Sequence, residues 1–208
     1  MINLPSVLDV SSTLGTISVN ERAVMELTKK FERLSSRSGK LKGTVYRSCA
    51  PKYATSADLL SGEGSRLYGG RWNPPGVTSV YGSFDPETAM AETLAGSNYF
   101  GIPVHSAMPR VFVAIEFKLS AVLDLTDGGI RKSLGISESR MLDCDWRRES
   151  KKGSDALTQA VGRAASETGL EAILVASAAI DDGENLVVFI NNLQRGSRLE
   201  LISLDKLS

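Results

Sequence analysis

The chain has 208 residues, of which 42% are hydrophobic and 23% charged, with 24 basic side chains against 24 acidic ones. A chain of this length forms one domain, or one domain with an appendage, and buries about 70% of its unfolded surface without needing a disulfide or a metal. The balanced charge argues against a general binder of the nucleic-acid backbone, and no apolar stretch is long enough to span a bilayer.

The cysteines and the histidine are too few and too scattered for a metal or redox site. Cys49 and Cys144 are far apart in the chain, and His105, the only histidine, lies in a predicted loop. The N-terminal sequence MINLPSVLDV lacks the charged segment and the apolar core of a signal peptide. We therefore expect no metal site, two reduced thiols and a cytoplasmic protein.

The first predicted element is an amphipathic helix in SVNERAVMELTKKFERL. Ser18 and Glu21 are placed to form a capping box at its start, and its buried face is predicted to consist of Val24, Leu27, Phe31 and Leu34. Residues 35–43 form a polar connector that contains glycine and serine. This pattern predicts an N-terminal helical appendage over residues 1–40 and a main domain over residues 41–208.

Two short predicted strands, TVYRSC and TSVYGS, lie before and after the stretch YGGRWNPPGV. A helix is predicted in DPETAMAETLAG, where Asp85 suits the N-cap, Pro86 the first helical position and Gly96 the end. Glu92 then lies in the body of this helix, with only alanine and glycine on the same face. That arrangement leaves room beside its carboxylate.

The second half of the chain alternates strands with polar segments. RVFVAIEFKL predicts a long strand, and residues 126–153, which are rich in charges of both signs, are predicted to be a surface excursion. Ser154 suits the N-cap of a helix that runs to about Thr168. EAILVAS and NLVVFIN, joined through IDDGE, predict a hairpin, and RLELISL supplies the last strand. The few strand–helix alternations favour an α+β fold with a mainly antiparallel sheet and flanking helices.

Arg71 is the first candidate for chemistry because its neighbours hold it in a stiff frame. Gly69 and Gly70 allow a sharp turn, and Asn73 is restricted by the proline that follows it. A guanidinium fixed in this way suits bidentate binding of a phosphate or a carboxylate. The plainer interpretation is a glycine-rich turn with an exposed arginine, followed by a Trp72 that packs in the core, and spacing alone favours it.

Four other residues also have both a functional and a plainer interpretation. Arg47 lies in a predicted strand, where it faces a ligand, a carboxylate or, most commonly, water at a sheet edge. Tyr81, at a strand end, either stacks on a flat ring or belongs to the core. Glu92 either stabilises positive charge on a sugar ring or faces solvent. Ser177 binds either a substrate hydroxyl or the backbone of the adjacent turn.

Taken together, these motifs resemble a known family. The order YR, GGRWNPPG, VYGS, AMAE, VAS and GENLVVF is similar to that of the RES domain, over roughly residues 43–190. The resemblance implies a fold like the ADP-ribosyltransferase core of diphtheria-type toxins. It also implies the site residues, which would be Arg47, Arg71, Tyr81, Glu92 and Ser177.

RES domain proteins are toxins of bacterial type II toxin–antitoxin pairs, so the resemblance also implies an activity. That activity is cleavage of the nicotinamide–ribosyl bond of NAD, which is a substrate and not a recycled cofactor, with water, inorganic phosphate or a protein as acceptor. Arg47 and Arg71 would hold the pyrophosphate, and Tyr81 would contact the nicotinamide or its ribose. Glu92 would offset the positive charge that grows on the ribose, and Ser177 would complete the ribose contacts.

The implied partners are an Xre-type helix–turn–helix antitoxin and a second copy of the chain. Two alternatives to NAD cleavage stay open at this point. One is a non-catalytic module that binds a nucleotide or a partner protein in the same pocket. The other is a glycosidase, which is weaker because no second acidic residue stands out as a partner for Glu92.

Overall fold

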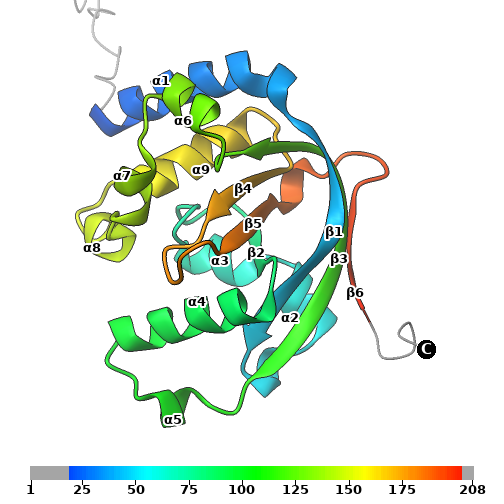
Figure 1. Cartoon of the computed structure of the whole chain (residues 1–208). Coiled ribbons are helices and arrows are strands. Elements are labelled where there is room, and N and C mark those ends of the chain that lie inside the picture. Colours follow the sequence, from blue (N-terminus) through cyan, green and yellow to red (C-terminus); the bar gives the residue numbers. More distant parts are fainter. Residues whose placement is uncertain (1–18, 203–208) are drawn as a thin grey trace, which may run out of the picture.

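The fold is built around a mixed β-sheet that closes on itself (Figure 1). The structure, a computed structural model, describes residues 19–202. The strands follow the order β1-β2-β5-β4-β3-β6, and a further pairing of β1 with β3 closes the sheet. Their bounds are β1 Gly39–Cys49, β2 Ser79–Ser83, β3 Val111–Asp124, β4 Ala172–Ala176, β5 Glu184–Phe189 and β6 Arg198–Leu201.

The pairing of β3 with β4 is parallel, whereas the other pairings in the sheet are antiparallel. The predicted α+β class is therefore confirmed, but the sheet is mixed and closed rather than simply antiparallel. The parallel pair follows from the long helical connection between β3 and β4, which returns the chain to the same end of the sheet. Parallel neighbours need such a crossover.

Closure of the sheet depends on a close approach of β2 to β1. The two strands meet at one register position, where Tyr46 lies opposite Ser83. A Cβ added to Gly82 would lie 2.5 Å from Cγ2 of Val45, which is too close for any other residue type. Glycine at position 82 therefore lets the sheet close at the place where the candidate site lies.

Helices lie on both sides of the sheet, with α1, α6 and α9 on one side and α4 on the other (Figure 1). No helix in residues 19–202 has both the length and the apolar character needed to cross a membrane. The α-helices are α1 Val19–Leu34, α2 Ser56–Leu60, α3 Glu63–Tyr68, α4 Pro86–Tyr99, α5 Val104–Ala107, α6 Gly128–Leu134, α7 Glu138–Leu142, α8 Trp146–Ser150 and α9 Leu157–Glu167. Short 3₁₀ helices occupy Ser35–Arg37, Pro51–Tyr53 and Ile190–Asn192.

The largest core cluster lies between α1, α9 and the sheet. The predicted apolar face of α1 is confirmed, because its members are all buried: Val24, Leu27, Phe31 and Leu34. Trp72 is 3% exposed and belongs to the same cluster, so its predicted role in packing is also confirmed. A Cβ on Gly162 of α9 would overlap the carbonyl of Trp72, so α9 and the Trp72 backbone are in direct contact.

The predicted capping box and the predicted domain boundary both concern the N-terminal part of the chain. Ser18, the N-cap of the predicted capping box, lies outside the described residues. The division at residue 40 stays a prediction, although β1 already begins at Gly39 and α1 shares its core with α9.

Residues 126–153 are not the surface excursion that their charge predicts, because they contain α6, α7 and α8. Ile130, Leu134 and Met141 from this segment are buried in the same core cluster as α1. α6 and α7 each bury apolar residues on one side and leave charged residues on the other, whereas α8 has no fully buried residue. The high overall charge hides this pattern in the sequence.

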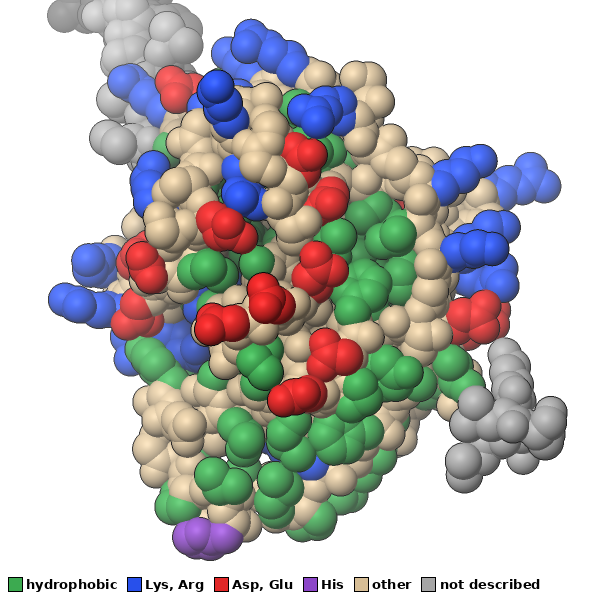
Figure 2. Space-filling view, viewed as in Figure 1, with side chains coloured by type: hydrophobic (Ala, Val, Ile, Leu, Met, Phe, Trp, Pro, Cys, Tyr) green, Lys and Arg blue, Asp and Glu red, His purple; other side chains and the backbone are tan. Residues whose placement is uncertain are grey.

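Two predicted helix boundaries and one predicted loop are also wrong. α4 continues through Gly96 to Tyr99, and the left-handed residue that follows its end is Gly101, with φ 64°. α9 begins at Leu157 rather than after Ser154, because the Gln159 side chain accepts a hydrogen bond from the Ala156 backbone N–H (3.1 Å). His105 lies in α5 and not in a loop. On the face drawn in Figure 2, acidic side chains gather near the middle, and most basic side chains lie toward the margins.

Candidate functional site

A cavity of ≈ 210 Å³ lies between β1, β2, β5 and α4. Its lining includes Arg47, Arg71, Tyr81 and Glu92, which come from four separate segments of the chain. Ser177 does not line the cavity, but its hydroxyl donates a hydrogen bond to Oε1 of Glu92 (2.7 Å). The structure therefore brings the predicted site residues together in one place.

The turn that carries Arg71 is held by its own backbone and by buried polar groups. Gly69 has a φ of 71°, which favours glycine, and the Gly70 N–H donates to the Asn73 carbonyl (2.8 Å). Asn73 is fully buried, and its side-chain amide donates to the carbonyls of Ser65 and Val77, both at 2.9 Å. The stiff frame predicted for Arg71 is confirmed.

Tyr81 uses its hydroxyl to support this turn. The hydroxyl donates to Oδ1 of Asn73 (2.6 Å) and accepts from the backbone N–H of Trp72 (3.0 Å). Burial raises the pKa of Tyr81 well above its usual range, although the hydrogen bond from Trp72 and the charges of Arg71 and Arg47 oppose this shift. The phenol is therefore neutral, and its proton is already engaged, so the ring is the part of Tyr81 that it offers to a ligand.

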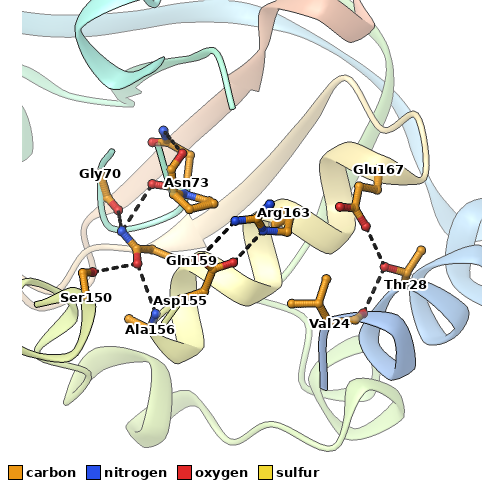
Figure 3. Close-up of polar contacts among 11 residues, drawn as sticks. Val24, Thr28, Gly70, Asn73, Ser150, Asp155, Ala156, Gln159, Arg163 and Glu167 are labelled. Carbon is orange, nitrogen blue, oxygen red and sulfur yellow. Dashed lines mark hydrogen bonds and ion pairs between the residues drawn. The ribbon is translucent and has the colours of Figure 1, made fainter. Parts of the chain in front are cut away.

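Gln159 of α9 supports the same turn from the core side (Figure 3). Its side-chain amide donates to the Gly70 carbonyl (3.0 Å) and makes a longer contact with the Asn73 carbonyl (3.4 Å). Its side-chain oxygen accepts from Ser150 Oγ (2.7 Å) and from the N–H of Ala156. This one buried glutamine ties α8, α9 and the Arg71 turn together.

Arg71 itself is anchored by the segment that the sequence predicted to be a surface excursion. Its Nη1 donates to the carbonyls of Met141 and Cys144, both at 3.1 Å, at the end of α7. The other guanidinium nitrogens of Arg71 form no hydrogen bond with residues 19–202. One edge of the guanidinium is therefore fixed, and the other is available to an anion.

Arg47 is a second half-buried cation that lines the cavity. Its Nη1 donates to the Leu59 carbonyl (2.7 Å), and it forms no ion pair within the described part of the chain. Burial lowers the pKa of Arg47, while electrostatic interactions with the Cys49 and Tyr81 side chains act in the opposite direction. Arg47 does not face bulk water at a sheet edge, which is the commonest environment for an arginine in a strand, because it lines the cavity.

Glu92 is the acidic group that lines the cavity, and one of its oxygens is fixed by two donors. Oε1 accepts from Ser177 Oγ and from Asn185 Nδ2, both at 2.7 Å. Ser83 in turn donates to Oδ1 of Asn185 (2.6 Å), which orients the amide. Oε2 forms no hydrogen bond with residues 19–202, so it is free to accept hydroxyl groups from a ligand.

Ser177 is positioned by the hairpin that the sequence predicted. β4 and β5 pair antiparallel, and the Ser177 N–H donates to the Gly183 carbonyl (2.7 Å) just beyond the ends of the strands. Its hydroxyl oxygen accepts a hydrogen bond from the Ala179 N–H (3.1 Å), and its hydroxyl group donates one to Glu92. Ser177 thus binds both the turn backbone and the candidate catalytic carboxylate.

Asn185 and Ser83 are site residues that the sequence analysis did not single out. Both are buried polar residues on strands, and both bond to the Glu92 network. The available signal was a polar residue at the end of a short apolar strand, since such a side chain needs a partner inside the protein once it is buried.

Comparisons with known proteins show the family to which the chain belongs. The model of the RES domain matches residues 44–203. The chain belongs to the RES domain family. Its fold resembles a crystal structure of the MbcT–MbcA toxin–antitoxin complex of Mycobacterium tuberculosis, with a TM-score of 0.67, 26% sequence identity, and coverage of 86% of this chain and 90% of that chain.

Two proteins of similar sequence are named for different activities. Over 134 residues the chain is 31% identical to the NAD(+) phosphorylase MbcT of Mycobacterium tuberculosis, and the match covers 63% of this chain. It spans just under two thirds (66%) of that relative's length. Over 65 residues it is 38% identical to a Prs ADP-ribosylating toxin of a Sphingobium species, covering 31% of this chain and 40% of that protein.

Proposed function

We propose that this RES domain protein is a toxin-like enzyme that binds NAD and cleaves its nicotinamide–ribosyl bond. The observation that carries the proposal is the arrangement of charge in the cavity. Arg47 and Arg71 are half-buried, lack an ion pair within residues 19–202, and share a cavity with Glu92. Unpaired cations in such a site favour an anionic ligand, and a dinucleotide carries a pyrophosphate.

Glu92 has the geometry needed to stabilise a ribosyl cation. When the bond between the ribose and nicotinamide breaks, its electron pair leaves with the nicotinamide, which becomes neutral, and positive charge develops on the ribose. This leaving group needs no general acid. A carboxylate fixed at Oε1 by Ser177 and Asn185 and free at Oε2 would bond the ribose hydroxyls and offset that charge.

The acceptor then forms a bond to the ribose carbon on the side from which nicotinamide departs or on the opposite side. We propose inorganic phosphate as the first candidate, because the relative that matches over 134 residues is named a phosphorylase. Water and a protein side chain remain acceptors to be compared with it, since a second relative is named for ADP-ribosylation.

The proposed surroundings of the enzyme follow from the same similarity. We propose an ADP-ribosyltransferase-like core from the family resemblance. We propose a cognate antitoxin because the similar solved structure is a toxin–antitoxin complex. The Xre type of that antitoxin and a homodimer of the chain are proposed from the family resemblance. A cytoplasmic location is consistent with Cys49 and Cys144, which are free thiols.

The test measures nicotinamide release from NAD with water alone, with inorganic phosphate, and with a candidate protein acceptor. Glu92→Gln is the informative variant because its amide oxygen can keep the bonds from Ser177 and Asn185 while the charge is lost. We expect kcat to fall about 10²- to 10³-fold. Glu87→Gln, on the exposed first turn of α4, is the matched control.

Two outcomes would contradict the proposal. Absence of nicotinamide release by the folded wild-type protein with every acceptor would rule out the enzyme, and tight NAD binding that is unaffected by Glu92→Gln would instead indicate a non-catalytic binding module. Equal turnover by Glu92→Gln and Glu87→Gln would remove Glu92 from the mechanism while leaving the activity in place.

A further inference from the structure

Arg147 on α8 lies beside the candidate site without lining its cavity. Its guanidinium carbon is 4.5 Å from the ring centre of Trp146, 4.8 Å from that of Tyr99 and 5.6 Å from that of Phe100. The last two residues lie at the C-terminal end of α4, next to which Figure 1 shows α8. Aromatic faces on two elements therefore hold this cation in a defined place.

That place is one helical turn from Glu92. Nη2 of Arg147 lies 3.6 Å from the position that a Cβ would take on Gly96. Gly96 follows Glu92 by four residues on α4, so both lie on the same face of the helix. The absence of a side chain at Gly96 leaves the space that the guanidinium occupies.

Arg147 has no anionic partner among the described residues. It is half-buried, and it forms neither an ion pair nor a hydrogen bond with residues 19–202. Burial lowers the pKa of Arg147, and the positive charge of Arg71 lowers it further, whereas Tyr99, Asp145 and Glu92 act in the opposite direction. The two guanidinium groups thus repel each other, and an anion bound to both would relieve that repulsion.

The backbone links the two arginines. Arg71 donates to the carbonyls of Met141 and Cys144, and the chain continues from Cys144 directly into α8. The same contacts that fix one edge of the Arg71 guanidinium therefore also set the position from which Arg147 extends. The pair is preorganised by the segment between α7 and α8.

We propose that Arg147 is a binding residue that, together with Arg71, holds a phosphate group next to the cavity. This inference rests on the proposed cleavage of NAD. A planar guanidinium that lies against aromatic rings keeps its edge N–H groups free for bidentate bonds to phosphate oxygens. The phosphate belongs either to the pyrophosphate of NAD or to inorganic phosphate that acts as the acceptor.

The first experiment compares Arg147→Met with Arg148→Met, a control on the next, exposed residue of α8. Nicotinamide release is measured against NAD concentration at saturating phosphate, and against phosphate concentration at saturating NAD. We expect Arg147→Met to raise one KM by about 10- to 100-fold while kcat changes little. A higher KM for NAD would show that Arg147 binds the pyrophosphate of NAD. A higher KM for phosphate alone would show that Arg147 binds the acceptor phosphate. Arg147→Lys, which keeps the charge but loses the planar fork, should restore only part of the affinity.

A second pair of variants changes Gly96 of α4, which lies beside the Arg147 guanidinium. Gly96→Ala adds a Cβ at ordinary contact distance from Nη2, so it should leave both KM values unchanged. Gly96→Leu fills the space that the guanidinium occupies, so it should reproduce the KM change of Arg147→Met. Melting temperatures of all these variants check that each one is folded.

Calorimetric binding of ADP-ribose and of inorganic phosphate separates this inference from the proposed function, because it needs no turnover. If the wild type releases nicotinamide but Arg147→Met and Arg148→Met agree in both KM values and in ADP-ribose affinity, the inference is wrong and the proposed function stands. If the wild type releases no nicotinamide but Arg147→Met weakens ADP-ribose or phosphate binding about tenfold relative to Arg148→Met, the anion site stands without catalysis. If the wild type neither turns over NAD nor binds either ligand, both are wrong.

Discussion

Tyr81→Phe tests whether the tyrosine hydroxyl acts on the protein or on a substrate. Removing it deletes the bond to Asn73 Oδ1 (2.6 Å) and the bond from the Trp72 N–H (3.0 Å). Because Asn73 is fully buried, its oxygen is left without a donor, and the Trp72 N–H loses its acceptor. At about 1–2 kcal/mol for each group left unsatisfied, the free energy of unfolding should fall by about 2–4 kcal/mol. In a chain of this length, that corresponds to a melting temperature lower by about 4–16 °C.

Urea denaturation of Tyr81→Phe, with Tyr53→Phe as the control, measures this loss. Tyr53 is 52% exposed, so removing its hydroxyl should change stability by less than about 0.5 kcal/mol. The aromatic ring that lines the cavity is retained in Tyr81→Phe, so KM and kcat measured well below the melting temperature should stay close to the wild-type values. If stability is unchanged and turnover is lost, the hydroxyl acts on the substrate and our reasoning is wrong.

Two further predictions concern the stability of the fold. Glu171 is fully buried; burial raises its pKa, but hydrogen bonds from the N–H groups of Ser120, Gln194 and Ala121 outweigh that effect and hold the pKa below its usual value. The ionised Glu171 therefore stabilises the fold above its unfolded-state pKa, and this contribution is lost as the pH falls through its folded-state pKa. Glu171→Gln should lower the free energy of unfolding by about 2–4 kcal/mol at pH 7. The variant should also lose less stability than the wild type as the pH falls. Gly162→Ala should lower the unfolding free energy by about 3 kcal/mol or more, because its Cβ would overlap the Trp72 carbonyl, whereas a stability equal to wild type would show that α9 can move away.

The start of α4 was predictable from the sequence, and its end was not. Asp85 accepts a hydrogen bond from the Thr88 N–H (2.7 Å), as its position before Pro86 predicts, because N-capping is a local interaction. Gly96 looked like a stop, but glycine ends a helix only where the chain turns into the left-handed region, and here that happens at Gly101. The extra turn carries Tyr99, and with it the aromatic ring that holds Arg147.

The main side chains of the site could be predicted from the sequence, but the backbone groups that hold them could not. Arg47, Arg71, Tyr81 and Glu92 line one cavity, and Ser177 bonds to Glu92, as their shared motif implied. The groups that fix Arg71, by contrast, are backbone carbonyls at the end of α7. Any residue type supplies a carbonyl, so no pattern in the sequence could have marked that contact.

The charges of the site also explain how it could distinguish the two ends of its proposed substrate. Under the proposed function, Arg47 and Arg71 attract the pyrophosphate, while Glu92 lies beside the ribose that becomes positive. The charge of the pyrophosphate does not change when the bond breaks, so its interaction with the arginines is equally strong before and during cleavage. The arginines therefore contribute mainly to binding. Glu92 meets a charge that grows only as the bond breaks, so it contributes mainly to kcat. Loss of an arginine should therefore raise KM more than it lowers kcat, and loss of the Glu92 charge should do the opposite.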